Sequence, residues 1–439
     1  MSLFAADCAA PGHPYWWDGV AAFPQLPDRA PETCDVLIVG AGYTGLSAAL
    51  VCADAGARVT VVDAGRPGQG ASSRNGGMFG AHPRLPFETV EKHFGISVAR
   101  GIYAEASQAY AFTRGLIERE AIDCDFSACG RIQMAWTPGH FEAQKRLVAN
   151  IKAVADFNME IVDRDALASE IRTDRYYGAI LFPEHGGLQP RKFHDGLLKA
   201  ALARGVTVVC DCPVEELTRS GTGFVARTPA GDIRAQRAIM ATNGYTRGRH
   251  GWLRRRIFPL PSYLIATEPL DADRIAALAP GRRMMVETRA RHSYFRVSPD
   301  GSRIVFGGRA AITQISPQRA AARLHETMCG IWPSLRDVRL THCWSGNTGF
   351  SFNHMPHVGS HNGVFHAIGF SGSGVVMAPY LGMKVAYQLL GDGRGQTAYS
   401  GTHLATRPYH FGGSPWFLHP GEFWYRHVVD RREDAEAQG

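Results

Sequence analysis

The chain has 439 residues, of which 45% are hydrophobic and 20% are charged, and its formal net charge is +7. This is ordinary globular composition, long enough for a large buried core and for two or three domains. The basic residues are mostly scattered, so the sequence does not indicate a nucleic-acid-binding protein.

The N-terminal residues and the cysteines exclude two further classes. The opening MSLFAADCAAPGHPYWWDG lacks the basic and apolar stretches of a signal peptide. No apolar run reaches the roughly 18 residues that a membrane helix needs. The nine cysteines are too sparse for a disulfide scaffold and lack zinc spacing. We therefore expect a cytoplasmic monomer or homodimer without a membrane span.

The first regular elements form one β–α–β unit after an irregular arm of about thirty residues. The run DVLIV over residues 35–39 is typical of a parallel strand that is buried on both faces. A helix is expected over residues 44–55, with Gly56 as its stop, and a second buried strand over residues 58–62. This order is typical of a doubly wound α/β fold.

The rest of the chain alternates between helical and strand patterns. We predict helices over residues 90–120, 192–204 and 375–390, strands over 130–136, 179–182, 206–209 and 238–242, and a mostly β region over 258–306. No internal repeat or low-complexity linker separates these segments. The alternation favours two domains that interrupt each other in sequence.

The residues between the first strand and the first helix form a GxGxxG turn. Gly40 permits the tight turn, Gly42 allows a pyrophosphate to approach, and Gly45 allows the helix to pack on the strand. Such a motif alone is weak evidence, but here Asp63 also ends the next strand, where an acidic residue binds ribose hydroxyls. The sequence therefore predicts a dinucleotide site, to which Tyr43, Thr44 and Ala64 also belong.

A second loop rich in glycine and serine follows Asp63 and favours FAD over a nicotinamide cofactor. A nicotinamide dehydrogenase would normally continue directly into a helix and a third strand. This loop could instead surround a pyrophosphate and a flavin with backbone amides and hydroxyls. Its candidate cofactor residues are Ser72, Ser73, Arg74, Asn75, Gly76, Gly77 and Met78.

Six segments together resemble the D-amino-acid oxidase-like FAD-dependent oxidoreductases. They are VLIVGAGYTGLSAAL, GASSRNGGMFG, GGLQPRKFHDGLLKAALARGV, IMATNGYT, WSGNTGFSFNHMPHVG and GVFHAIGFSGSGVVMAPYLGMKVA. Within this superfamily the chain is most similar to gamma-glutamylputrescine oxidase-type amine oxidases. The resemblance covers residues 14–391 and implies a glutathione-reductase-like α/β fold, in which an FAD-binding Rossmann domain is interleaved with an antiparallel-sheet substrate domain.

The resemblance also implies domain limits and further cofactor residues. The expected FAD-binding domain combines residues 1–95, 188–250 and 341–439, and the substrate-binding domain combines 96–187 and 251–340. A glycine-rich turn before the last helix would lie at the pyrimidine edge of the flavin, where the helix dipole stabilises negative charge. The further cofactor residues are Val214, Ala241, Thr242, Gly346, Gly369, Ser371, Gly372, Ser373, Gly374 and Val375.

The implied reaction is hydride transfer from an amine to the flavin. An imine and then an aldehyde form, and O2 accepts the electrons to give hydrogen peroxide. The resemblance favours a gamma-glutamylated or N-substituted alkylamine as substrate. There are three alternatives. The substrate could be an N-methyl amino acid, the enzyme could be a dehydrogenase, or the chain could be a flavin-binding subunit without amine chemistry.

Aromatic residues near the flavin are candidates for the substrate face. Trp344, Phe350, Phe352 and Tyr294 could line an apolar slot and hold a cation, although each alone is more often a core residue. Trp344, Tyr294 and His354 are the candidate catalytic residues. For His354 and His357, a structural or flavin-edge role is favoured over catalysis.

Three other features bear on the cofactor and the acceptor. Cys343 falls near the cysteine that carries an 8α-thioether to the flavin in monomeric sarcosine oxidase-like relatives, yet its surroundings, HCWSG, differ from theirs. We favour non-covalent FAD. The corresponding segment 303–308 lacks the lysine that promotes the reaction with O2 in those relatives. The five arginines of residues 247–256 are predicted to be a solvated surface, with docking of a carboxylate as the alternative.

Overall fold

The computed structural model describes residues 3–80, 82–152 and 158–437. Its first large sheet is built around β1 (Thr33–Val39), which pairs in parallel with β2 (Val59–Val62) and with β11 (Gly231–Met240). The strand order is β17-β18-β11-β1-β2-β8, and the hairpin of β9 and β10 extends from β11. The other strands are β8 (Thr207–Val209), β9 (Glu216–Ser220), β10 (Gly223–Thr228), β17 (His357–His361) and β18 (Val364–Ile368).

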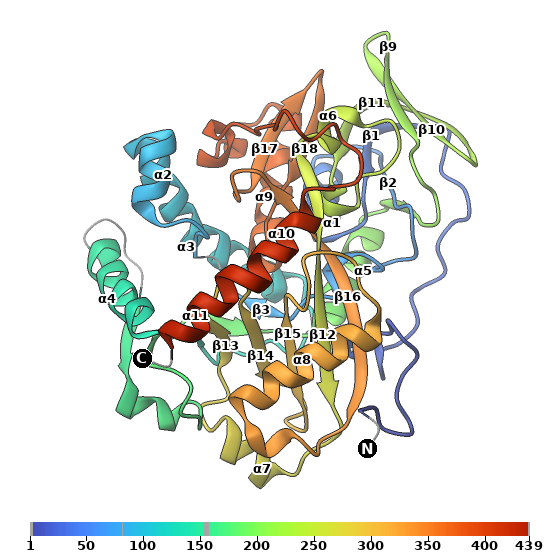
Figure 1. Ribbon diagram of the computed structural model, residues 1–439. Helices are drawn as coiled ribbons and strands as arrows, with labels where there is room; N and C mark the ends of the chain where they lie inside the picture. The colour runs from blue at the N-terminus through green and yellow to red at the C-terminus, as the bar shows by residue number, and fades with distance from the viewer. Residues whose placement is uncertain (1–2, 81, 153–157, 438–439) are drawn as a thin grey trace.

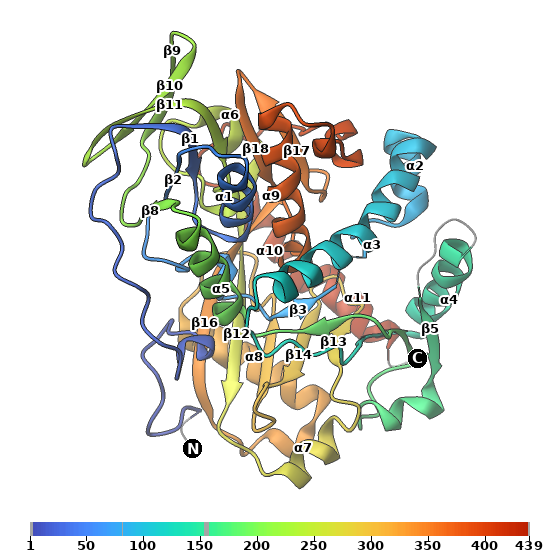
Figure 2. The same cartoon turned by 180° about the vertical axis from the view of Figure 1, so that it is seen from behind.

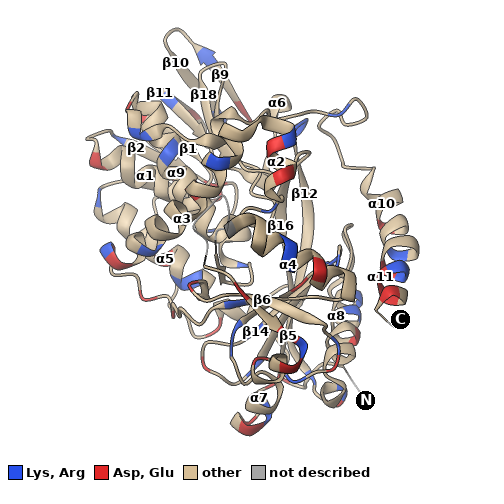
Figure 3. Cartoon of the chain, turned by 90° about the vertical axis from the view of Figure 1, so that its left-hand side faces the viewer, with Lys and Arg blue, Asp and Glu red and all other residues tan. Residues whose placement is uncertain are grey.

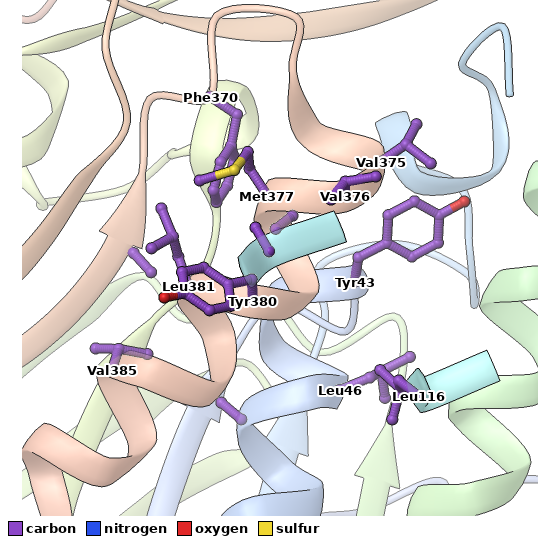
Figure 4. Packing of buried hydrophobic residues seen from close by; sticks show 14 of the residues in the cluster. Tyr43, Leu46, Leu116, Phe370, Val375, Val376, Met377, Tyr380, Leu381 and Val385 are labelled. Carbon is purple, nitrogen blue, oxygen red and sulfur yellow. The ribbon is translucent and has the colours of Figure 1, made fainter. Parts of the chain in front are cut away.

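The helices α1 (Tyr43–Asp54) and α9 (Gly374–Leu390) pack on this sheet, and α5 (Pro190–Ala203) packs against α1. The α1 and α9 helices contact each other closely, and the Ser47 hydroxyl donates a hydrogen bond to the carbonyl oxygen of Pro379 at 2.7 Å. Figure 4 shows Tyr43 of α1 beside Val375 and Val376 of α9. This contact brings the starts of the two helices together.

The second large sheet is mostly antiparallel and has the order β16-β12-β15-β14-β13-β4-β6-β5. It lies in the lower half of Figures 1 and 2, below the first sheet, and α8 (Pro317–Ile331) packs against it. Its strands are β4 (Arg131–Met134), β5 (Glu160–Asp163), β6 (Gly178–Phe182), β12 (Ile257–Thr267), β13 (Met284–Glu287), β14 (Ser293–Val297), β15 (Ile304–Gly308) and β16 (Leu340–Ser351).

Three details differ from the sequence-based expectation. The helix expected over residues 90–120 is divided into α2 (Phe87–Phe94) and α3 (Ile96–Arg119), because Gly95 adopts φ +85° between them. The helix α7 (Ala272–Leu278) interrupts the region expected to be β. The strand β16 pairs with β12 in the second sheet, so that sheet extends past the expected boundary at residue 340.

The remaining elements are short or peripheral. They are α4 (Pro138–Lys152), α6 (Gly251–Arg254), the paired strands β3 (Met78–Phe79) and β7 (Gly186–Gly187), and the C-terminal helices α10 (Leu418–Trp424) and α11 (Asp430–Glu436). In the described part of the arm before β1, the only helix is the 3-10 turn η1 (Tyr15–Trp17). Arg291 pairs with Asp430 and so ties the C-terminal helices to the second sheet.

Charged residues of both signs are interspersed over the face seen in Figure 3. Among the described residues, no helix is long and apolar enough to span a membrane.

Candidate active site

The turn from β1 into α1 lies very close to other backbone atoms. Gly40 has φ +112°, and a Cβ there would lie 2.8 Å from the carbonyl oxygen of Ala241. A Cβ on Gly45 would lie 1.9 Å from the carbonyl oxygen of Gly40. Both positions therefore require glycine, as the tight turn and the close packing of helix on strand demand.

The Asp63 carboxylate is fixed at the end of β2 by two backbone amides. It accepts hydrogen bonds from the amide nitrogens of Ala41 at 2.8 Å and Gly65 at 3.0 Å. Burial raises the pKa of Asp63, and the two amide hydrogen bonds oppose that rise. The carboxylate is thus positioned to accept further hydrogen bonds from a ligand.

A cavity of about 470 Å³, here named the dinucleotide cavity, lies against Asp63 and the first residues of α1 and α9. The N-terminus of a helix offers free amides and a positive dipole to phosphate. Of the predicted cofactor residues, the wall of this cavity contains Gly40, Gly42, Tyr43, Thr44, Asp63, Ala64, Ser72, Arg74, Asn75, Val214, Ala241, Thr242, Gly346, Gly372, Gly374 and Val375.

A second cavity, also of about 470 Å³, lies between the second sheet and the loop that follows Asn75. Its wall contains the predicted residues Gly76, Met78, Tyr294, Ser371 and Ser373. The two cavities adjoin, because they share the wall residues Ala71, Arg74, Asn75, Gly346, Thr348, Gly372 and Val375. A ligand could therefore extend from one cavity to the edge of the other.

A comparison with known families matches residues 35–388 to the family described as FAD dependent oxidoreductase. The chain belongs to this family.

Curated relatives of this FAD-dependent oxidoreductase agree with the match. It is 32% identical over 375 residues to "Probable oxidoreductase OrdL" of Rhizobium meliloti, covering 84% of this chain and 85% of the relative. It is 30% identical over 362 residues to "Gamma-glutamylputrescine oxidoreductase" of Escherichia coli, covering 82% and 84%. The predicted resemblance to oxidoreductases of this type is confirmed.

Solved structures show the same fold at low sequence identity. Glycine oxidase from Geobacillus kaustophilus superposes with a TM-score of 0.69 at 19% identity, over 86% of this chain and 100% of the other. L-proline dehydrogenase from P. horikoshii gives 0.67 at 18%, over 90% and 100%. The expected α/β fold with an FAD-binding Rossmann-type domain is confirmed.

The residues around the adjoining cavities fit FAD. Gly42 and Ser72 meet in the wall of the dinucleotide cavity, and a Cβ on Gly42 would lie 2.9 Å from Ser72 Oγ, so only glycine permits this close approach. The carboxylate of Asp63 points to the same cavity, where it could bind ribose hydroxyls. The start of α9 lies at the shared wall, where its dipole would stabilise negative charge on a flavin ring.

Three indole N–H groups hold the loop that lines the shared wall. Trp16 donates to the carbonyl oxygen of Asn75 at 2.7 Å, and Trp17 donates to Ser73 Oγ at 2.9 Å. Trp344 donates to the carbonyl oxygen of Arg74 at 2.9 Å and is 1% exposed. Trp344 lines neither cavity, and its indole supports the loop of residues 70–78 through Arg74.

The thiol of Cys343 points away from both cavities. It donates a hydrogen bond to the carbonyl oxygen of Pro317 at 3.2 Å and belongs to the core between the second sheet and α8. Burial raises the pKa of Cys343 to about 12, so the sulfur stays protonated. Covalent attachment requires a thiolate at the ring, and Cys343 lines neither cavity.

The other two candidate catalytic residues differ in position. Tyr294 lines the second cavity, its hydroxyl lies 2.8 Å from Ser262 Oγ, and burial raises its pKa to about 12. His354 lines neither large cavity; its ring packs edge-on against Phe350, and burial lowers its pKa to about 4. Only Tyr294 is placed to contact a substrate.

Several other predicted residues act beside the cavities rather than in their walls. His357 is bonded to Asn353 and Thr402, and Phe352 packs against Phe258, so both are core residues. The exposed Arg247 lies on the surface, as expected, but also lines the dinucleotide cavity. The predicted cofactor residues outside both walls are Gly45, Ser73, Gly77, Cys343 and Gly369.

Arginines in the second cavity were missed by the sequence analysis. The guanidinium carbons of Arg84 and Arg309 lie 5.3 Å and 5.1 Å from the ring centre of Phe350. Arg84 donates to the carbonyl oxygen of Ser371 at 3.0 Å, and no carboxylate among the described residues pairs with either arginine. Burial lowers the pKa of Arg309 to about 10. No local motif marks these residues, which come from distant segments.

Proposed function

We propose that this chain oxidises a small amine that carries a carboxylate, a gamma-glutamylated or otherwise N-substituted alkylamine, to an imine that hydrolyses to an aldehyde. FAD, when bound, supplies the acceptor for the hydride from the carbon beside the nitrogen. The observation that supports this function is the arginine pair Arg84 and Arg309, which lies in a cavity adjoining the dinucleotide cavity. O2 is the proposed electron acceptor, with hydrogen peroxide as the product.

Arg84 and Arg309 suit a carboxylate because both line the second cavity and neither has an acidic partner among the described residues. Arg84 is exposed at the cavity and Arg309 is half-buried. A carboxylate would accept charge-assisted hydrogen bonds from both. Their two positive charges also act on the amine of the same substrate. A nearby positive charge and burial both lower an amine pKa, so the cavity favours the neutral amine that hydride transfer requires.

His292 and Tyr294 complete the polar wall near this arginine pair. Burial lowers the pKa of His292 well below its usual value, and the charges of Arg309 and Arg84 lower it further, so the imidazole is neutral. Tyr294 keeps its proton and could donate a hydrogen bond to a substrate. These two side chains, rather than Trp344 or His354, are the proposed substrate contacts of this region.

A panel of amines tests the proposed function. The holoenzyme would be mixed without oxygen with gamma-glutamylated alkylamines, N-methyl amino acids and simple alkylamines, and loss of the flavin absorbance would be recorded. Peroxide would be measured in air. We expect bleaching by carboxylate-bearing amines and peroxide formation. Bleaching without peroxide would show a dehydrogenase, a preference for N-methyl amino acids would favour the alternative substrate class, and no bleaching by any amine would contradict the proposal.

We further propose that the FAD is held non-covalently. The buried thiol of Cys343 supports this, because it is bonded to Pro317 on the far side of the strand. Acid-denatured protein is expected to release all its flavin, and the intact polypeptide should have its unmodified mass. A Cys343→Ala variant should retain the same flavin content. A flavin adduct on the Cys343 peptide would contradict this prediction.

The domain limits also remain a proposal, with one change. We assign β16 to the substrate-binding part, because it pairs with β12 along its length. The FAD-binding part would then comprise residues 1–95, 188–250 and 352–439. The cytoplasmic location and the monomeric or homodimeric state stay predictions.

A further inference from the structure

A third arginine in the second cavity has no acidic partner among the described residues. Arg131 on β4 is 8% exposed, and its Nε and Nη2 atoms are fully buried without a hydrogen bond among the described residues. Its guanidinium carbon lies 4.2 Å from the ring centre of Phe182. Burial alone lowers the pKa of Arg131 to about 9, with no acidic group acting against it. An unpaired guanidinium at such a depth is costly to a fold.

The charges of the cavity wall leave this arginine unbalanced. Of the described residues that line the second cavity, Glu287 is the only acidic one. Its carboxylate already pairs with Arg289 at 2.6 Å and accepts a hydrogen bond from Tyr176 at 3.0 Å. Arg84, Arg131 and Arg309 therefore give the cavity a positive excess. A ligand with a net positive charge would be repelled, and an anionic ligand would be attracted.

Arg131 lies well apart from the arginine pair. Arg309 follows β15, and the sheet order places β14 and β13 between β15 and β4. Three strand spacings amount to about 14 Å. One carboxylate of an α-amino acid cannot reach both ends of this cavity.

We propose that Arg131 forms a second anion subsite, which narrows the proposed gamma-glutamylated or N-substituted amines to those with a carboxylate at each of two ends. One carboxylate binds Arg84 and Arg309, and the other binds Arg131 at the far end of the cavity. This inference rests on the proposed function, since it describes the substrate of the same site. It also explains why the fold keeps a buried guanidinium without an internal partner, because the ligand supplies the missing charge.

Ligand binding without turnover tests the subsite. The holoenzyme would be titrated with straight-chain dicarboxylates from glutarate to suberate and with monocarboxylates of equal chain length, and the flavin absorbance would report binding. We expect one dicarboxylate length to bind at least about tenfold more tightly than its matched monocarboxylate. Dicarboxylates that never bind more tightly than monocarboxylates would overturn the proposal, and this comparison needs no variant.

Substitutions test whether the preference for a dicarboxylate comes from Arg131. Arg131→Met should abolish the preference for the dicarboxylate while monocarboxylate affinity stays within about twofold, and Arg131→Lys should retain part of it. Arg283→Met is the matched control. Arg283 precedes Met284, the residue of β13 that pairs with Arg131, but it pairs with Glu170 and lines neither cavity. A preference that survives in Arg131→Met would also overturn the proposal.

The two proposals can fail separately. Dicarboxylate selectivity without oxidation of any amine would leave the subsite standing and contradict the proposed reaction. Oxidation of amines without any dicarboxylate selectivity would support the reaction and contradict the subsite.

Discussion

Replacing Gly45 with alanine is expected to lower the free energy of unfolding by about 3 kcal/mol or more and to abolish FAD binding. The new Cβ would lie 1.9 Å from the carbonyl oxygen of Gly40 and 3.2 Å from Ile38 Cγ2. Because the nearest atom belongs to the backbone, no side-chain rotation can relieve the clash. The α1 helix would have to move away from β1, and the turn that faces the dinucleotide cavity would move with it.

Urea unfolding followed by circular dichroism, together with the flavin content per chain, measures this effect. Gly115→Ala is the matched control, because Gly115 is also a helical glycine but a Cβ there would meet no atom within 4 Å. Alanine should stabilise that helix by up to about 1 kcal/mol and leave the flavin content unchanged. A Gly45→Ala protein with normal stability and full flavin content would show that helix and strand tolerate greater separation.

Replacing Arg309 with methionine is expected to lower kcat/KM for a carboxylate-bearing amine by about 100-fold, which corresponds to about 2.7 kcal/mol. Arg309 is half-buried beside Phe350, and the charged groups that act on it include Arg84. The loss should fall mainly on KM, because the guanidinium binds the carboxylate before and during the reaction. The methyl ester of the same amine should lose much less than the carboxylate, because only the effect of Arg309 on the amine pKa is removed.

The thermal stability of Arg309→Met should not fall as its kcat/KM does. Since Arg309 has no carboxylate partner among the described residues, methionine removes an unpaired, half-buried charge, so the Tm should stay the same or rise. Arg319→Met is the control for net charge, because Arg319 is exposed on α8 and lines neither cavity. Steady-state kinetics and thermal unfolding measure both quantities. An unchanged KM for the carboxylate-bearing amine would remove Arg309 from the proposed binding site.

The sequence predicted the β1–α1–β2 unit and its glycine turn, because their signals are local. Gly40, Gly42 and Gly45 occupy one turn, and Asp63 ends the next strand, so strand and helix periodicity are sufficient to bring them together. The start of α9 was also recognisable from its glycine-rich turn. Each of these features is set by residues that are neighbours along the chain.

The sequence was less informative along β16, where the surroundings of each side chain depend on the face of the strand to which it points. Neighbouring side chains on a strand point to opposite faces. Cys343 points to Pro317 at the start of α8, and Trp344 points to Arg74 in the loop of residues 70–78. Aromatic and cysteine side chains are common on both faces of a buried strand, so composition alone could not assign either one. The pairing with β12 decided their positions.

By itself, the sequence determined the family, the glycine turn between β1 and α1, and the glycine- and serine-rich loop after β2. Only the tertiary structure decided the second cavity. Arg84 comes from the loop before α2, Arg131 from β4 and Arg309 from the end of β15. Isolated arginines carry no spacing signal, and sheet pairing over long sequence separations is what places them in one wall. The three charges favour an anionic ligand only in combination. That none of the three has a carboxylate partner in the wall becomes clear only when all the described wall residues are in place.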